Sequence, residues 1–251
     1  MEQNEYIFGI RAVIEAIEAG KEIDKVLVKK GLTGELAGEL RALMRERRVV
    51  CQAVPAERLD RITRRNHQGV VALLSAVAYH NLGNMVQQLY EEGKVPLLVV
   101  LDGMTDVRNF GAVARTCECA GVDAVVIPER GSVSVNADAV KTSAGALHSL
   151  PVCREHSAAS AVRFLKSSGY KIYGASEKGS TSYTSPDYTV PTAIVMGAED
   201  TGISPDVAKM CDALAAIPQF GAIGSLNVSV ACGVMLYEVV RQRLSAGLGV
   251  G

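Results

Sequence analysis

The sequence of 251 residues lacks the short motifs that mark several common classes of enzyme. It contains no G-x-x-x-x-G-K-[ST] segment, which argues against a P-loop ATPase. No G-x-G-x-x-G follows an expected strand, so an ordinary dinucleotide-binding site is disfavoured. There is also no G-x-S-x-G, the turn that presents the nucleophile of many hydrolases. These absences leave the function open and direct attention to less common motifs.

Metal-binding, secretion and membrane signals are also missing. The six cysteines and four histidines form no C-x-x-C pair and no metal-ligand spacing, which predicts that no metal is bound. Most of the cysteines lie in apolar surroundings, as expected for buried free thiols in a reducing cytoplasm. The N-terminus has no basic start followed by an apolar run, and no segment is suited to span a membrane. We therefore expect a cytoplasmic protein.

The sequence has almost no net charge, −1 in total, which is not the overall signature of a nucleic-acid binder. The exception is the segment 41–65, where eight arginines outnumber three acidic residues. A local basic patch of this kind can contact phosphates, although a solvated helix face explains it equally well. The arginines are Arg41, Arg45, Arg47, Arg48, Arg58, Arg61, Arg64 and Arg65.

The pattern of apolar residues predicts a small α/β domain over residues 1–78. Helices are expected at 9–20, 35–48 and 56–63, and strands at 25–30, 49–55 and 69–77. The segment 79–94 is expected to be a linker that contains one helix.

From residue 95 to 251 the pattern becomes more strongly apolar and predicts a parallel sheet covered by helices on both faces. Continuous apolar runs indicate buried strands at 95–102, 122–128, 170–176, 192–197 and 213–218. Helical spacing lies between them, at 110–121, 136–147, 158–169 and 204–212.

Three loops at the carboxyl ends of these strands carry polar groups and glycines. They contain "LDGMTDVRNFGAVART", "VMGAEDTGIS" and "IPQFGAIGSLNVS". Ligands bind at this edge of open parallel sheets, and glycine lets a ligand approach the backbone closely. No histidine lies in these loops, so a Ser-His-Asp triad has little support.

The third loop leads into "SLNVSVACGVMLYEVV", which is expected to form a helix that is buried on nearly every side. Ser225, Asn227 and Ser229 would lie in its first turns, with the two serines on one face. Because buried polar groups need partners, these residues either face a ligand or serve as ordinary caps of the helix, with Ser225 as the N-cap.

The three loops resemble the motifs of the SpoU (TrmH) family of RNA 2′-O-ribose methyltransferases, members of the SPOUT superfamily. The matching segments are N-x-G-A-x-x-R-T at 109–116, G-x-E-x-x-G at 197–202 and S-L-N-V-S-V-A at 225–231. "RNHQGVVA" resembles the end of the family's substrate-binding domain, whose fold is similar to ribosomal protein L30e. The greatest resemblance is to the bacterial type that methylates a guanosine ribose in 23S rRNA.

The resemblance implies an L30e-like RNA-binding domain (1–78), the linker (79–94) and a SPOUT methyltransferase domain (95–251). The second domain would contain a parallel sheet and a deep trefoil knot. S-adenosylmethionine would be the cofactor, the protein would be a homodimer, and 23S rRNA would be its partner. The resemblance places five residues at the cofactor: Met196, Gly197, Ile217, Pro218 and Leu226.

The same resemblance makes Arg115 the central catalytic residue, supported by Asn109, Glu199, Ser225 and Asn227. Either Arg115 or Glu199 could be the general base, and a guanidinium scarcely loses its proton, so a phosphate contact is the safer role for Arg115. Phe220 departs from the family, since many relatives have a smaller residue there.

Three other functions remain open: methylation of a tRNA ribose, RNA binding without catalysis, and a small-molecule α/β enzyme with a regulatory N-terminal domain. The "RNHQG" domain favours rRNA, and the complete set of motif residues argues against a loss of catalysis. The basic segment argues against a small-molecule enzyme. RNA contacts are expected from Arg64, Arg65, Asn66 and His67.

The basic segment generates the first prediction. Replacing Arg64 and Arg65 together by alanine should weaken RNA binding and flatten its salt dependence, because fewer counterions are released per complex. Cofactor affinity should stay unchanged. Filter binding at several salt concentrations measures the RNA affinity and its salt dependence. If both are unaltered, the patch is only a solvated surface.

Overall fold

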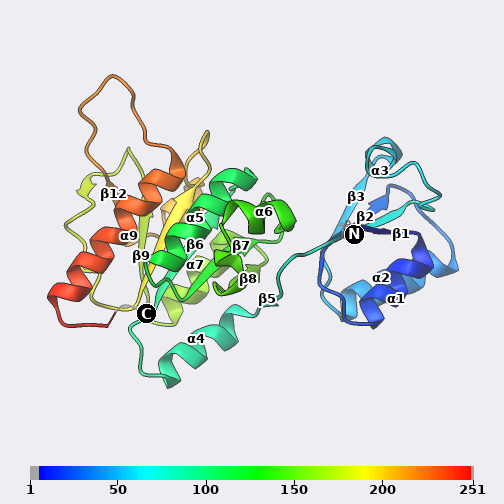
Figure 1. Ribbon diagram of the computed structural model, residues 1–251, viewed down its shortest axis with the longest axis horizontal. Helices are drawn as coiled ribbons and strands as arrows, with labels where there is room; N and C mark the ends of the chain where they lie inside the picture. Colours follow the sequence, from blue (N-terminus) through cyan, green and yellow to red (C-terminus); the bar gives the residue numbers. More distant parts are fainter. Residues whose placement is uncertain (1–5, 250–251) are drawn as a thin grey trace. The chain divides into compact units, whose positions relative to one another are not determined.

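The computed structural model describes residues 6–249, and the chain divides into two units (Figure 1). The first unit comprises the residues up to Ala78 together with Ser134–Ala137. The second comprises Tyr79–Val133 and the residues from Asp138 onward. Each unit has its own sheet and its own apolar core.

The first unit is a four-stranded mixed sheet with the order β1-β4-β2-β3. The strands are β1 (Tyr6–Phe8), β2 (Ile23–Lys29), β3 (Cys51–Val54) and β4 (Val70–Leu74). Strand β4 pairs antiparallel with β1 and β2, whereas β2 and β3 are parallel. The sequence pattern predicted all of these strands except β1, which is only three residues long.

Helices cover both faces of this sheet. They are α1 (Ile10–Glu18), α2 (Glu35–Glu46) and α3 (Ala56–Ile62). Val13 and Ile14 of α1 and Leu40 of α2 are buried in one core cluster with strand residues. Leu59 of α3 is buried in a second cluster with Leu27 and its neighbours. The alternation of strand side chains between two faces explains these two clusters.

The second unit is an eight-stranded sheet with the order β10-β12-β9-β11-β6-β7-β8-β5, and every pair in it is parallel. The strands are β5 (Tyr79–His80), β6 (Leu97–Asp102), β7 (Ala124–Pro128), β8 (Val152–Glu155), β9 (Lys171–Ala175), β10 (Thr181–Ser182), β11 (Thr192–Gly197) and β12 (Ala213–Ala216). This confirms the expected parallel sheet. The pattern missed β5, β8 and β10, which are short and only partly apolar.

Helices lie on both faces of this sheet (Figure 1). The helices are α4 (Leu82–Glu91), α5 (Val107–Cys119), α6 (Ala137–Thr142), α7 (Ala158–Ser167), α8 (Pro205–Ala208) and α9 (Val228–Ser245). Leu82 and Val86 of α4 and Leu165 of α7 share one core cluster with alternate strand residues. Helices α5 and α9 pack against each other on the other face.

Two expected elements differ in the structure. The segment 79–94 is not a linker, because β5 pairs with β8 and α4 buries Leu82, Val86 and Leu89 in the second unit. The helix expected at 136–147 is split into α6 and a short 3-10 helix, Ala146–His148. The break lies at Ala144 and Gly145, whose φ angles of 53° and 89° cannot continue a right-handed helix.

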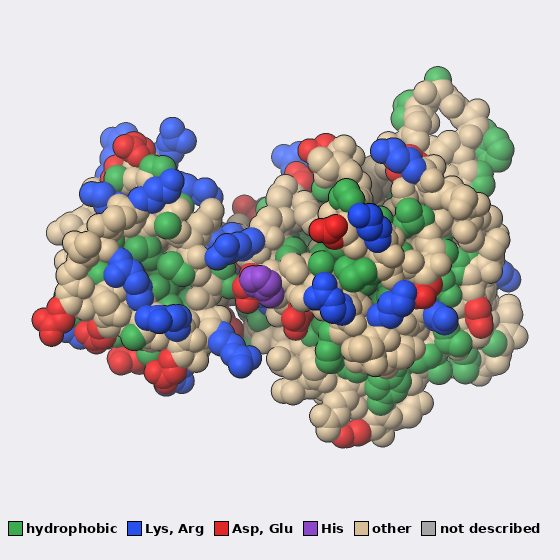
Figure 2. All heavy atoms as spheres, turned by 180° about the vertical axis from the view of Figure 1, so that it is seen from behind, with side chains coloured by type: hydrophobic (Ala, Val, Ile, Leu, Met, Phe, Trp, Pro, Cys, Tyr) green, Lys and Arg blue, Asp and Glu red, His purple; other side chains and the backbone are tan. Residues whose placement is uncertain are grey.

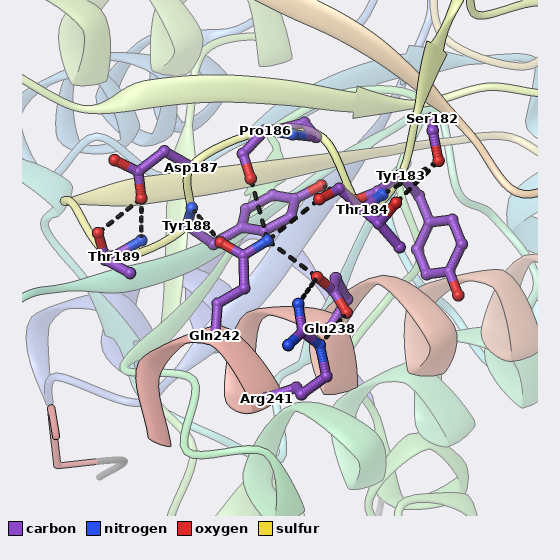
Figure 3. A network of polar contacts seen from close by, with 10 residues as sticks. All are labelled: Ser182, Tyr183, Thr184, Pro186, Asp187, Tyr188, Thr189, Glu238, Arg241 and Gln242. Carbon is purple, nitrogen blue, oxygen red and sulfur yellow. Dashed lines mark hydrogen bonds and ion pairs between the residues drawn. The ribbon is translucent and has the colours of Figure 1, made fainter. Parts of the chain in front are cut away.

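Buried polar contacts fix the C-terminal helix α9. The guanidinium of Arg243, only 4% exposed, donates to the carbonyls of Val95 at 2.7 Å, Pro96 at 3.1 Å and Tyr188 at 3.1 Å. The neighbouring Gln242 donates to Pro186 and accepts from the Tyr188 amide, both at 3.1 Å (Figure 3). Helix α9 is thereby tied to the start of β6 and to the segment before β11.

The six cysteines are free thiols, as expected, but only three of them are buried. Cys117, Cys153 and Cys232 lie in the core, whereas Cys51 and Cys119 are exposed. Burial raises the pKa of the Cys153 thiol to about 12, which keeps it protonated and unreactive near neutral pH.

Within residues 6–249, no helix combines the length and apolar composition that a membrane crossing requires. The knotted path of the chain stays a prediction of the resemblance.

Candidate functional site

Three polar side chains from distant parts of the sequence meet at the carboxyl edge of the second sheet. The Asn109 amide nitrogen donates to Glu199 Oε2 at 2.8 Å, across 90 residues. The Asn227 amide nitrogen donates to Asn109 Oδ1 at 3.0 Å, across 118 residues, and to Glu199 Oε1 at 3.3 Å. Each side chain contacts the other two. We call this ring of hydrogen bonds the polar triad.

Helix capping orients two members of the triad. Asp106 is the N-cap of α5 and accepts from the Asn109 backbone amide at 2.8 Å, which places Asn109 in the first turn. Asn227 is the N-cap of α9, and its Oδ1 accepts from the amide and hydroxyl of Ser229. With its oxygen engaged by the helix, Asn227 can direct only its amide nitrogen toward the other two residues.

This geometry corrects the expectation for Ser225. Helix α9 begins at Val228, so Ser225 lies in the preceding loop and is neither the N-cap nor on a helical face shared with Ser229. Ser229 takes part in the cap, because its amide and hydroxyl both donate to Asn227 Oδ1. The helix is also less buried than expected, because Val230, Tyr237 and Leu244 are exposed on its surface. The sequence of this helix is apolar on nearly every side. Such a pattern fits a fully buried helix and equally a helix whose outer face is apolar and exposed.

Glu199 is carried by a tight loop after β11. Ala198 and Gly202 exchange two backbone hydrogen bonds, and Gly202 has a φ angle of 69°. A Cβ at Gly197 would lie 2.1 Å from the carbonyl carbon of Gly202, so only glycine permits this turn. The resemblance assigned Gly197 to the cofactor. The structure adds that the folded-back loop already requires glycine at this position.

A cavity of about 230 Å³ opens beside this loop, at the ends of β9, β11 and β12. Four of the five residues expected at the cofactor line it: Met196, Gly197, Ile217 and Leu226. Pro218 is not among its lining residues, although Ile217 and Gln219 on either side of it are. Ser225 also lines the cavity.

One wall of this cavity consists of residues that are not among the site residues expected from the sequence. Ser176, Glu177 and Lys178, in the loop after β9, form part of its lining. A Cβ at Gly179 would lie 2.3 Å from the Leu214 carbonyl oxygen, so this loop lies tightly against β12. The signal available in the sequence was a polar, glycine-containing loop that follows a buried strand.

A second cavity, of about 290 Å³, adjoins the first and is also lined by Glu199. It is lined by Asp106, Asn109 and residues 103–105, and it shares Ala198, Glu199, Asp200 and Val228 with the first cavity. Glu199 therefore faces two adjoining spaces. Among the described residues, no cluster of three or more His, Cys, Asp or Glu side chains could hold a metal ion.

Arg115 is not part of the polar triad. It lies six residues beyond Asn109 on α5 and is exposed, and its side chain forms no hydrogen bond or ion pair within residues 6–249. Six residues correspond to about 9 Å along a helix and to a rotation of about 120° from Asn109. The guanidinium is thus available to a group outside this chain.

In the first unit, the expected RNA-contacting residues lie in the loop between α3 and β4. Arg64, Arg65 and Asn66 are exposed, and the Arg65 guanidinium lies 5.9 Å from the centre of the Phe8 ring. His67 instead turns inward, with Nδ1 accepting from the Gly69 amide at 3.0 Å and Nε2 2.9 Å from Asp60. These contacts give His67 a structural role in the turn, and its expected contact with RNA stays a prediction.

All eight arginines of the basic segment are exposed. Figure 2 shows Lys and Arg side chains spread over the visible face of this unit, with Asp and Glu among them. A surface of this composition permits contact with phosphates, and the assignment of particular residues to RNA stays a prediction.

Two family models match the chain. Residues 96–237 match the SpoU rRNA Methylase family, and residues 6–80 match the RNA 2′-O ribose methyltransferase substrate binding family. A protein of Staphylococcus haemolyticus described as a TrmH family tRNA/rRNA methyltransferase is 36% identical over 96% of this chain and 97% of its own length.

Solved structures are also similar. The SpoU methyltransferase AviRb from Streptomyces viridochromogenes, in complex with the cofactor AdoMet, has a TM-score of 0.61 and 26% identity, covering 96% of this chain and 90% of its own. An AdoMet-bound rRNA methyltransferase from Sinorhizobium meliloti has a TM-score of 0.60 and 27% identity, covering 94% of this chain and 86% of its own. A TrmH/SpoU tRNA modifying enzyme from A. aeolicus has a TM-score of 0.55 and 29% identity, covering 66% of this chain and 86% of its own.

The loop after β11 generates the second prediction. Gly197→Ala should lower the free energy of unfolding by about 1–3 kcal/mol, because the new methyl group overlaps the backbone of the loop. Urea unfolding followed by circular dichroism measures the change. Gly221→Ala is the matched control, since a Cβ there meets nothing within 4 Å. Equal unfolding midpoints for the two variants would contradict the account of Gly197.

Proposed function

Because this chain belongs to the SpoU (TrmH) family of RNA methyltransferases, we propose that it methylates the ribose 2′-hydroxyl of a guanosine in 23S rRNA, with S-adenosylmethionine as the methyl donor. The observation that carries the proposal is the polar triad, which joins one residue from each of the three family motifs between two adjoining cavities.

The first cavity fits S-adenosylmethionine in its chemistry. Met196, Ile217 and Leu226 offer apolar surface for the adenine and the methionine stem, and Glu177 offers a carboxylate for ribose hydroxyls. Glu199 and Asp200 bring negative charge to the wall that would face a positively charged sulfur. Bound there, S-adenosylmethionine supplies an electrophilic methyl group.

The second cavity would receive the target ribose. Glu199 borders both cavities, so its carboxylate would lie beside the point where the methyl donor and the ribose meet. Two amide nitrogens hold this carboxylate in one orientation. In our proposal, Glu199 accepts the proton of the 2′-hydroxyl and Asn109 and Asn227 keep it aligned. Much of the rate then comes from fixing two bound reactants in place.

Arg115 would hold the RNA backbone. A guanidinium remains charged at any physiological pH and offers a planar set of donors that matches a phosphate. Arg115 has no partner among the described side chains, so it can bind a phosphate without first breaking an ion pair. This role suits arginine better than that of a general base.

The two-unit organisation favours rRNA over tRNA as the substrate. The rRNA methyltransferase from Sinorhizobium meliloti aligns with 94% of this chain, whereas the tRNA modifying enzyme from A. aeolicus aligns with 66%. The match of residues 6–80 to a substrate-binding family supports the first unit as the part that selects the RNA.

We further propose that the protein acts as a homodimer in the cytoplasm. Val230, Tyr237 and Leu244 are 51%, 55% and 62% exposed, and their seven-residue spacing aligns them along one face of α9. An apolar stripe of this length is suited to packing against a second copy. The free state of all six cysteines agrees with a reducing compartment.

The substrate is tested by methyl transfer in vitro. The protein is incubated with tritium-labelled S-adenosylmethionine and unmodified transcripts of 23S rRNA or tRNA, and the RNA is digested to nucleosides. We expect labelled 2′-O-methylguanosine from 23S rRNA. Label in tRNA alone would establish the tRNA alternative, and label on a base or no label would contradict the proposed reaction.

Arg115 provides the next prediction. Arg115→Ala should reduce methyl transfer by at least about 100-fold, as expected when a transition-state contact is lost. Affinity for S-adenosylmethionine in calorimetry should not change. Arg115→Lys should recover little activity, because lysine keeps the charge but loses the planar set of donors.

Arg163→Ala is the control for this experiment, since Arg163 is an exposed arginine on α7, the helix on the opposite face of the sheet. It should remain fully active. Near-normal activity of Arg115→Lys would show that charge alone suffices, and an active Arg115→Ala would remove Arg115 from the mechanism.

A further inference from the structure

The loop between β12 and α9 exposes two large apolar side chains. Phe220 is 97% exposed and Ile223 is 79% exposed. Figure 1 shows this segment as a loop that stands out from the second unit. Residues 217–227 contain no charged side chain, so the tip of the loop is an apolar surface that faces solvent.

Both ends of this loop belong to the first cavity. Gln219 lines it on the side of β12, and Ser225 and Leu226 line it on the side of α9. Phe220 directly follows Gln219 in the chain, and its side chain is exposed to solvent rather than part of the cavity lining. A Cβ added at Gly221 or Gly224 would meet nothing within 4 Å, which shows that the tip is not packed on the rest of the chain.

Sequence-specific recognition of folded RNA mostly targets loops, bulges and ends, where a nucleotide has left its stack. Proteins hold such a nucleotide by stacking its base on an aromatic ring. The other exposed aromatic side chains of the second unit are poorly placed for this task. Tyr90 and Phe164 belong to α4 and α7 on the opposite face, and Tyr237 lies ten residues along α9 from Asn227, about 15 Å away.

We propose that Phe220 is the stacking platform for the base of the methylated nucleotide, and that it positions the ribose at the polar triad. This inference rests on the proposed function, because it assumes that RNA is the substrate. A second copy of the chain could also cover the apolar tip. That use would need no aromatic ring, however, and it would make the loop part of a protein interface.

The chain contains no tryptophan, so Phe220→Trp introduces a single fluorescent reporter at the site. We expect its fluorescence to fall on addition of the 23S rRNA transcript, because a stacked base quenches indole emission. Phe164→Trp is the matched control, as Phe164 is 37% exposed on α7, and its emission should not change. Binding of RNA without quenching at position 220 would overturn the proposal.

Kinetics provide the second readout. Phe220→Ala should raise the KM for RNA by about 5- to 150-fold, the range expected from loss of one stacked base, with unchanged affinity for S-adenosylmethionine. Phe220→Tyr should restore a normal KM, whereas Phe220→Leu, which is apolar but not aromatic, should behave like alanine. A Leu variant as effective as wild type would contradict stacking.

Two further results separate the alternatives. If Phe220→Ala shifts the mass measured by light scattering from dimer to monomer, the loop tip serves a second copy and the stacking proposal is wrong. If 23S rRNA quenches the Phe220→Trp variant but the wild-type protein transfers no methyl group to that RNA, the proposed function fails while the stacking contact stands.

Discussion

A ring of hydrogen bonds among Asn109, Glu199 and Asn227 is the constraint on which the rest of the site depends. It joins the start of α5, the loop after β11 and the start of α9. Two helix caps determine its directions, because Asp106 fixes the first turn of α5 and Ser229 occupies the oxygen of Asn227. A carboxylate held by two amides thereby borders two adjoining cavities. The reaction proposed for this protein needs the methyl donor and the 2′-oxygen in direct contact, with a proton acceptor beside the point where they meet.

The buried framework of the second unit could be predicted from sequence because its central strands are apolar on both faces, as in "LLVVLD" and "TAIVMG". The glycines of the motifs could also be recognised in the sequence, but the contacts that require glycine at these positions could not. Gly111 is required because a Cβ there would lie 2.6 Å from Thr142, and Gly197 because its own loop folds back on it. The Gly111 contact joins segments that are separate in sequence, and the Gly197 contact depends on how its loop turns, so no local pattern reveals either.

Where the structure differs from the sequence-based expectations, contacts between distant parts of the chain are again the cause. Ser225, Asn227 and Ser229 are all expected in the first turns of the last helix, but the helix begins only at Val228. Asn227 is its N-cap and also bonds to two distant residues. The segment 79–94 has the composition of a connector, yet α4 buries three apolar side chains. The motifs named Asn109, Glu199 and Asn227, which the structure brings together. They did not indicate that Arg115 stands apart from the triad, exposed and without a partner in the described part of the chain, as a group that binds RNA would be.

The central claim is that the triad acts as one unit, and a double-mutant cycle on the rate of methyl transfer tests it most directly. Asn109→Ala, Asn227→Ala and the double variant are compared at saturating S-adenosylmethionine and RNA, with the fold checked by circular dichroism. Because each asparagine aligns the same carboxylate, the double variant should lose little more activity than either single variant. Losses that multiply in the double variant would show that the two asparagines act independently and would contradict the account.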